Sequence, residues 1–270
     1  MRILFIGDIV GRPGKHACSQ LVPKLIKDRE LHCVIANAEN VVAGSGLTPA
    51  AYNKLLHQGI DACTMGDHIY RRLEIVPALH NSDRIVKPAN LPPEAAGREF
   101  TVIEARNGVP VAVISLLGRT YMNMKSDCPF HAVDRVLDQI PADVRIILVD
   151  MHAETTSEKV AMGWYLDGRV SAVVGTHTHI PTADEHILPQ GTAYITDVGM
   201  TGPYDSVLGR DKDRVIRALV TGMPHPYDVA HHDVHLSAVQ IEVDAVSGRA
   251  SAIERVYMKD ESPITGDEVD

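Results

Sequence analysis

Five short apolar segments of this chain each end in side chains that bind metal ions. One of them, residues 170–174, leads into Gly-Thr-His-Thr-His, so that His177 and His179 stand one residue apart. The other four segments lead to these polar positions: Asp8, Glu39 with Asn40, Asp67 with His68, and His152. Short apolar segments are typical of buried strands, and carboxylates and imidazoles that meet at strand ends hold metal ions. The pattern therefore predicts a binuclear metal site.

The stretches between these segments have the character of helices, which predicts an α/β fold with a central sheet covered by helices. Apolar spacing and capping signals indicate helices at residues 17–27, 49–58, 73–79, 130–140, 156–167 and 214–221. Further strands are expected at residues 100–104, 109–116, 193–196, 235–243 and 252–257. Binding sites of open α/β sheets form beyond the carboxyl ends of the strands, so we expect the five polar strand ends to converge.

Local signals refine the expected boundaries. Thr48 followed by Pro49 is a helix start, and Thr155 with Glu158 is expected to form a capping box. Asn107-Gly108 predicts a tight hairpin between two strands. A turn is expected at residues 11–14, a long surface loop at 87–97, and His152 is expected in a strand-to-helix loop.

Composition limits the kind of protein. The chain has 270 residues, 45% of them hydrophobic, so we expect one domain over residues 1–258 with an acidic, mobile tail at 259–270. A formal net charge of −9 argues against general binding to nucleic acid, which needs clustered Lys and Arg. No apolar run approaches the ~20 residues of a membrane helix. Four dispersed cysteines and no export signal favour a cytoplasmic protein.

Five motifs together resemble the calcineurin-like metallophosphoesterases: residues 7–11, 37–40, 64–68, 150–159 and 175–179. The further match through residues 197–203 is similar to the bacterial 2′,3′-cyclic-nucleotide 2′-phosphodiesterase family. The resemblance implies a central mixed β-sandwich flanked by helices, in four α-β-β-α layers. It also implies two divalent ions, Fe or Mn before Mg, with a bridging hydroxide that attacks phosphorus. The implied reaction opens 2′,3′-cyclic nucleotides to 3′-nucleotides.

The resemblance also implies a role for each polar residue. The first ion would be held by Asp8, Glu39, Asn40 and His179. The second ion would be held by Glu39, Asp67, His152 and His177. His68 would be the catalytic proton donor to the departing ribose oxygen, or alternatively a support for its neighbour Asp67.

Two positions depart from the family pattern. Asp67 stands where the pattern has Asn, and its extra negative charge would weaken the Lewis acidity of the second ion. Lys87 stands where Arg is expected. If this position contacts phosphate, the lysine ammonium would offer a point charge in place of the two parallel hydrogen bonds of a guanidinium.

Two alternative functions stay open, a phosphomonoesterase and a weakly active regulatory protein that binds metal and nucleotide. The expected partner is a small nucleotide, with no stable nucleic-acid or membrane binding, and a homo-oligomer is left open.

Several other polar residues have competing interpretations. Three histidines are more typical of an exposed strand edge than of a second metal site: His231, His232 and His235. Three carboxylates either orient metal-bound histidines or cap nearby backbone: Asp150, Glu154 and Asp197. Residues 44–46 either cradle a phosphate or form a flexible turn.

Overall fold

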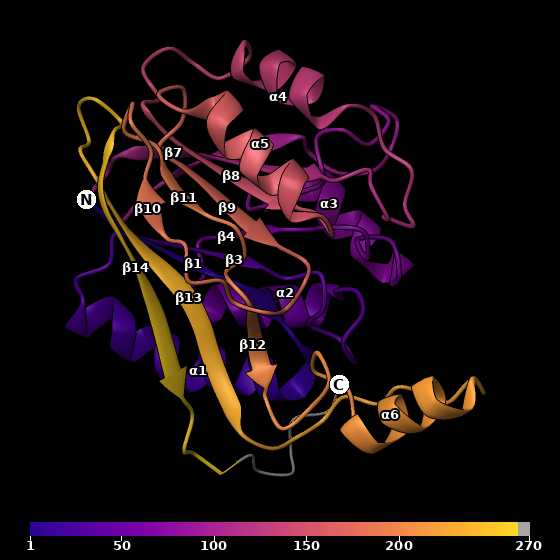
Figure 1. Cartoon of the computed structure of the whole chain (residues 1–270). Helices are drawn as coiled ribbons and strands as arrows, with labels where there is room; N and C mark the ends of the chain where they lie inside the picture. Colours follow the sequence, from indigo (N-terminus) through magenta and orange to yellow (C-terminus); the bar gives the residue numbers. More distant parts are fainter. Residues whose placement is uncertain (264–270) are drawn as a thin grey trace.

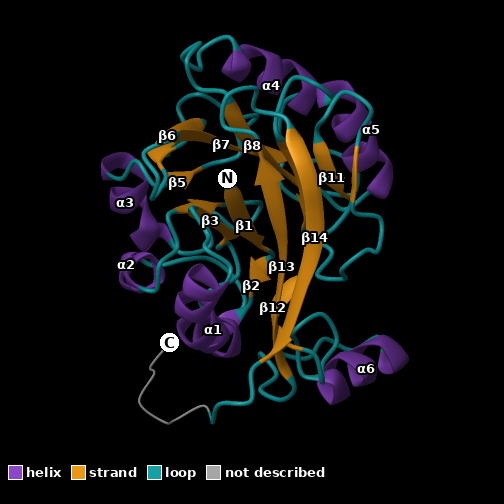
Figure 2. Cartoon of the chain, turned by 90° about the vertical axis from the view of Figure 1, so that its left-hand side faces the viewer, coloured by secondary structure: helices purple, strands orange, loops and turns teal. Residues whose placement is uncertain are grey.

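The computed structural model describes residues 1–263 and contains two β-sheets packed face to face, with helices on both outer surfaces (Figure 1). Helices α1 (Gly11–Asp28), α2 (Pro49–His57) and α3 (Val76–Asn81), preceded by the short 3-10 helix η1 (Leu73–Ile75), cover the first sheet. Helices α4 (Pro129–Leu137) and α5 (Thr156–Leu166) cover the second sheet, as the view in Figure 2 also shows. Helix α6 (Lys212–Thr221) projects from the body.

The first sheet has eight strands in the order β2-β12-β13-β1-β3-β4-β5, with β14 paired to β13. Its strands are β1 (Arg2–Ile6), β2 (Asp8–Ile9), β3 (Cys33–Asn37), β4 (Ala62–Thr64), β5 (Ile85–Val86), β12 (Met200–Pro203), β13 (Val234–Val243) and β14 (Ala250–Lys259). The second sheet has six strands in the order β10-β11-β9-β8-β7-β6. Its strands are β6 (Phe100–Glu104), β7 (Pro110–Leu117), β8 (Ile146–His152), β9 (Ala172–Thr176), β10 (His186–Ile187) and β11 (Ala193–Ile195).

Strand β1 shows how the sequence builds the layers. Successive side chains of a strand point to opposite faces, so Ile3 and Phe5 enter the apolar cluster between the sheets. Leu4 and Ile6 enter the cluster beneath α1 and α2. A third cluster lies between the second sheet and helices α4 and α5. Three apolar interfaces separate four layers, and the predicted α-β-β-α fold is confirmed.

Parallel strands bring the polar strand ends to one edge. Strands β1, β3, β4 and β5 run parallel in the first sheet, and β7, β8 and β9 run parallel in the second. The carboxyl ends within each sheet therefore share an edge, where ligands of α/β proteins are expected.

Within residues 1–263, no helix is both long enough and apolar enough to cross a membrane.

Most expected elements are present, and three boundaries were wrong. Residues 11–14 form the first turn of α1 rather than a separate turn. Strand β8 continues through His152, which therefore belongs to the sheet and not to the loop after it. The segment after β5 is not a surface loop throughout, because residues 87–91 are buried. The predicted hairpin at Asn107-Gly108 is confirmed by the antiparallel pairing of β6 with β7.

The two predicted helix starts have different outcomes. Thr48 caps α2 as expected, since its hydroxyl accepts a hydrogen bond from the N–H of Ala51 at 3.4 Å. Thr155 is the N-cap of α5 as expected, but no capping box forms, because its hydroxyl donates to Oε2 of Glu158 at 2.8 Å and caps no backbone N–H. Glu158 accepts hydrogen bonds from the N–H groups of Arg119 and Thr120. Residue 259 of the predicted tail is the last residue of β14, and residues 264–270 lie outside the described part of the chain.

Candidate metal centre

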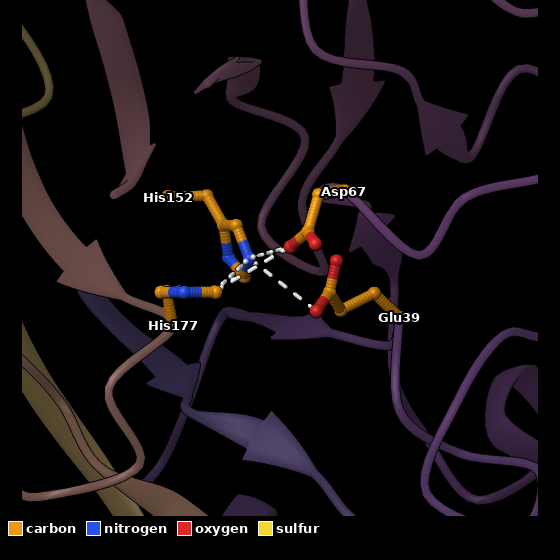
Figure 3. Close-up of side chains that lie close together, drawn as sticks. All are labelled: Glu39, Asp67, His152 and His177. Atoms are coloured by element: carbon orange, nitrogen blue, oxygen red, sulfur yellow. Dashed lines mark hydrogen bonds and ion pairs between the residues drawn. The ribbon is translucent and has the colours of Figure 1, made fainter. Parts of the chain in front are cut away.

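Four polar side chains from both sheets converge at the shared edge (Figure 3). Glu39, Asp67, His152 and His177, here called the Glu39 cluster, each offer one ligand atom, and these atoms lie within 4.8 Å of one another. The first three residues are buried and His177 is partly exposed. Glu39 and Asp67 follow strands of the first sheet, whereas His152 ends β8 and His177 follows β9. The site is thus built between the two sheets.

The ligand atoms of the Glu39 cluster face a common point. Nε2 of His152 lies 3.2 Å from Oδ1 of Asp67 and 3.3 Å from Oε1 of Glu39. Nδ1 of His177 lies 3.1 Å from Nε2 of His152 and 3.5 Å from Oδ1 of Asp67. Two carboxylates and two imidazoles at this spacing match the donor chemistry of a divalent transition metal.

Glycine at position 66 leaves the space in which these atoms meet. A Cβ atom at Gly66 would lie under 3.0 Å from both Oε2 of Glu39 and Nε2 of His152. Real side chains essentially never approach so closely. Gly66 is therefore required by the cluster itself, and the residues present fit a bound metal.

Electrostatics keep the carboxylates ionised. Burial favours the neutral acid at Glu39, but the neighbouring imidazole of His152 outweighs it and lowers the pKa of Glu39. Burial also opposes ionisation at Asp67, where hydrogen bonds from His152 and His177 lower the pKa below its ordinary value. Burial lowers the pKa of His152, yet the charge of Glu39 and the contact with Asp67 raise it overall. Glu39 and Asp67 are therefore ionised, as metal ligands must be.

A second group of polar side chains adjoins the Glu39 cluster and is joined by hydrogen bonds of the Asn40 amide. Nδ2 of Asn40 lies 3.1 Å from Oε1 of Glu39, 3.2 Å from Nε2 of His179 and 3.4 Å from Oδ1 of Asp8. Nε2 of His179 is 3.8 Å from the same Asp8 oxygen. Glu39 therefore touches both groups. We call the set of Asp8, Asn40 and His179 the Asp8 group.

His68 borders both groups and is also open to solvent. Its Nδ1 atom lies 2.7 Å from Oδ1 of Asn40 and 3.2 Å from Oε1 of Glu39. Its Nε2 atom lies 3.7 Å from Oδ2 of Asp67, and a quarter of the side chain is exposed. Burial lowers the pKa of His68, but the hydrogen bond and charge of Glu39 raise it overall. With His68, all eight side chains singled out from the sequence meet at one place.

Hydrogen bonds behind the histidines aim their free nitrogen atoms at the cluster. Thr176 donates its hydroxyl proton to Asp150 at 2.6 Å, so its oxygen accepts from Nδ1 of His152 at 2.8 Å. Nε2, the other ring nitrogen of His152, then faces the cluster. Oε2 of Glu154 lies 3.2 Å from Nε2 of His177, which turns Nδ1 of that ring inward. Asp150 and Glu154 thus orient histidines, Asp150 through Thr176.

Asp197 has the second of the two expected roles, because its carboxylate accepts a hydrogen bond from a backbone N–H beside the histidines. Its Oδ2 atom accepts hydrogen bonds from the N–H of Thr178 at 3.2 Å and from the Thr178 hydroxyl at 2.7 Å. The same oxygen pairs with Nζ of Lys159 at 2.6 Å, and both side chains are buried. Thr178 separates His177 from His179, whose φ angles are positive at 97° and 65°. The buried ion pair therefore supports a strained backbone that presents both histidines.

Sequence reasoning missed Lys159, although a signal was present. Helix α5 buries Lys159, Met162, Gly163 and Leu166 on one face. A lysine at an otherwise apolar, inward-facing position is rare unless its charge is paired. The missing partner could not be read from the sequence, because Asp197 lies 38 residues further along.

The side chain of Lys87, for which a phosphate contact was considered, bonds to backbone carbonyl groups. Its Nζ atom donates to the carbonyl groups of Pro92 at 2.9 Å, Pro93 at 3.3 Å and Ala95 at 2.7 Å. Burial lowers the pKa of Lys87, and only 1% of the residue is exposed. Lys87 therefore closes the loop that follows β5 and points away from solvent.

The late histidines form no metal cluster. In the described part of the chain, the Glu39 cluster is the only group of three or more His, Cys, Asp or Glu residues with metal-binding spacing. His231 and His232 are exposed, as expected. His235 is less exposed than expected, because its ring stacks on Tyr257 at 4.6 Å and pairs with Asp233 at 3.1 Å.

Two stacked sheets with carboxylates and imidazoles gathered at their strand ends define a metallophosphoesterase, a hydrolase of phosphate esters. The chain belongs to the YmdB-like protein family, whose model matches residues 4–256. The family resemblance noted from the motifs is thereby confirmed.

Relatives match the chain over nearly its whole length. A Bacillus subtilis (strain 168) protein named 2′,3′-cyclic-nucleotide 2′-phosphodiesterase is 46% identical, over 97% of this chain and 98% of the relative. A crystal structure of a hypothetical protein from Thermus thermophilus is 40% identical with a TM-score of 0.89, covering 96% of this chain and 99% of that one. The structure of a Mycoplasma pneumoniae phosphatase is 32% identical with a TM-score of 0.90, covering 97% and 95%.

Proposed function

We propose that this protein is a metal-dependent phosphodiesterase that hydrolyses 2′,3′-cyclic nucleotides to 3′-nucleotides. The observation that carries the proposal is the continuity of two ligand groups through Glu39, with His68 at their solvent side. The reaction named for the Bacillus subtilis relative supports the choice of substrate. A cytoplasmic location belongs to the same proposal.

Two divalent ions, Fe or Mn before Mg, complete the proposed centre. The Glu39 cluster would hold one ion, and the Asp8 group with Glu39 would hold the other. When bound, the ions would polarise the phosphate, lower the pKa of the attacking water and stabilise the leaving oxygen. Three carboxylates in the two groups offset much of the charge of two such ions.

His68 is the residue placed to move a proton. Its Nδ1 atom is held by the side chain of Asn40, which fixes the orientation of the ring. Solvent exposure of the side chain leaves room for a substrate next to it. A fixed imidazole beside the ligands, and not itself among them, can protonate the ribose O2′ as its bond to phosphorus breaks.

The test is hydrolysis of 2′,3′-cyclic AMP by the manganese-loaded protein, with the product identified by chromatography. We expect 3′-AMP from the wild type and a kcat reduced about 10²–10⁴-fold in His68→Ala, as for loss of a general acid. Manganese binding should persist in His68→Ala, which separates proton transfer from metal loss. Release of 2′-AMP, or equal rates with and without His68, would contradict the assignment.

Asp67 gives a specific reason to keep the regulatory alternative. With Asp8 and Glu39 it is a third carboxylate at the site, and its Oδ1 atom lies among the ligand atoms of the Glu39 cluster. Its charge would reduce the Lewis acidity available to the substrate. An inactive wild type with an active Asp67→Asn variant would favour the weakly active, ligand-binding protein. Faster cleavage of p-nitrophenyl phosphate than of the cyclic nucleotide would favour the phosphomonoesterase.

A further inference from the structure

We propose that Arg210 is a positioning residue that organises the Asp8 group. Its guanidinium joins two loops that are far apart in the sequence, residues 41–46 and residues 207–210. The first loop follows Asn40 directly, and the second supplies the hydrogen-bond partner of His179. The inference rests on the two-ion centre proposed above. In that centre, the Asp8 group would be positioned by a residue that is not itself a ligand.

Residues 41–46 form a tight turn that returns to Glu39. The N–H of Val42 donates to the carbonyl of Gly46 at 3.0 Å, and the N–H of Gly46 donates to the carbonyl of Glu39 at 2.5 Å. Ala43 and Gly44 have positive φ angles of 50° and 71°. Positive φ is unfavourable for alanine, so this turn needs support from outside. The N–H groups of Val42, Ser45 and Gly46 donate to carbonyl groups of residues 39–46, which favours a structural turn over a phosphate cradle.

The support comes from the guanidinium of Arg210. Nη1 donates to the carbonyl of Ala43 at 2.9 Å and to that of Tyr227 at 3.1 Å, and Nη2 donates to the carbonyl of Gly44. The Cζ atom would lie 2.7 Å from a Cβ placed at Gly44, so the guanidinium lies flat against this glycine. A planar group with several donors in fixed directions can serve three carbonyls at once, which the ammonium of lysine cannot.

The backbone around Arg210 acts on His179. Reciprocal hydrogen bonds of 2.9 Å and 3.0 Å join the backbones of Val207 and Arg210 and close a turn around Leu208. The carbonyl of Leu208 accepts from Nδ1 of His179 at 3.0 Å. Nε2 of His179 is then directed at Asn40 and Asp8. One residue thus holds both the turn after Asn40 and the partner of His179.

Two ligands of the Glu39 cluster, His152 and His177, are positioned without Arg210. His152 belongs to a buried strand and is oriented by Thr176, and His177 is oriented by Glu154. Loss of Arg210 should therefore weaken the binding of one ion and leave the affinity for the other unchanged. A general loss of stability would instead weaken both.

The test titrates Mn²⁺ into the metal-free protein by calorimetry, for wild type, Arg210→Gln and Arg210→Lys. We expect two bound ions in the wild type, and in Arg210→Gln one ion of unchanged affinity and one weakened at least tenfold. Arg210→Lys should fall between them. The electron paramagnetic resonance spectrum of Mn²⁺ should change from that of a coupled pair to that of a single ion.

Two further variants sharpen the test. Gly44→Ala should reproduce the effect of Arg210→Gln, because its methyl group displaces the guanidinium. Arg214→Gln is the matched control, since Arg214 pairs with Asp228 at the surface nearby, and it should bind two ions normally. Equal affinities for both ions in Arg210→Gln and wild type would overturn the inference. Uptake of a single ion by the wild type would contradict the two-ion proposal itself.

Discussion

Lys159 shows how one buried charge supports a site that it does not enter. Removal from water disfavours both Lys159 and Asp197, and their mutual contact at 2.6 Å makes the arrangement tolerable. The carboxylate of Asp197 also binds Thr178, which lies between two of the candidate ligands. A side chain on α5 therefore influences the backbone of the histidine motif through a single carboxylate.

We expect Lys159→Met to lower the free energy of unfolding by about 3–5 kcal/mol, because the buried carboxylate of Asp197 loses its counterion. Urea denaturation followed by circular dichroism measures this change. The double variant Lys159→Met with Asp197→Asn should recover part of the stability, since no uncompensated charge is left. A single variant as stable as the wild type would show that Asp197 is satisfied by Thr178 and Gly199 alone.

At the scale of elements, the short strand β4 ends two residues before Gly66, where the site leaves no room for a side chain. Met65 and Gly66 carry the chain from β4 to Asp67, past Glu39 and His152. Glu39, which follows β3 of the same sheet, and His152, at the end of β8 in the other sheet, approach so closely that a methyl group at position 66 has no space. The geometry of the strand end, and not only the ligands, therefore defines the site.

We expect Gly66→Ala to reduce manganese affinity by at least tenfold while the protein remains folded, because the methyl group displaces Glu39 or His152. Calorimetric titration measures the affinity. The matched control is Gly163→Ala, where a Cβ atom would lie equally close, under 3.0 Å, to the ring of Tyr194. That variant should lose stability but keep its metal affinity. Unchanged binding in Gly66→Ala would mean that the cluster has more freedom than its packing indicates.

Short apolar segments with polar ends, helical apolar spacing and capping signals were enough to predict the main elements and the eight polar residues of the candidate site. Partners distant in sequence were not predictable: Asp197 for Lys159, Ala43 and Gly44 for Arg210, and the carbonyl groups around Lys87. The capping box failed for the same reason, since the N–H groups of a distant loop bind Glu158. Local patterns specify which residues lie at an element's end, and tertiary packing decides what they contact.

At the scale of the molecule, three apolar clusters join the four layers. The cysteines lie in two of these clusters. Cys18 on α1 and Cys63 on β4 lie in the cluster between the first sheet and its helices, and Cys33 lies between the sheets. Burial raises the pKa of Cys63 to about 12, and it raises the pKa values of Cys18 and Cys33 as well. Cys128 is only partly buried.

We expect a thiol reagent at pH 8 to modify at most one cysteine, Cys128, in the native protein and all four after unfolding in urea. A buried thiol with a raised pKa is neither accessible nor ionised at that pH. Absorbance of the released chromophore counts the thiols, and mass spectrometry locates them. Rapid native modification of Cys33 would show that the two sheets separate readily.

The position of the Glu39 cluster between two sheets has a consequence for how the chain matures. Each sheet alone contributes an incomplete half, acidic on one side and rich in imidazole on the other. Tight capture of a cation must wait until the sheets have docked in the correct register, and mass action then favours that docked state. Binding of the ion therefore stabilises only chains whose sheets have docked correctly, because a misdocked chain does not bring the four ligands together.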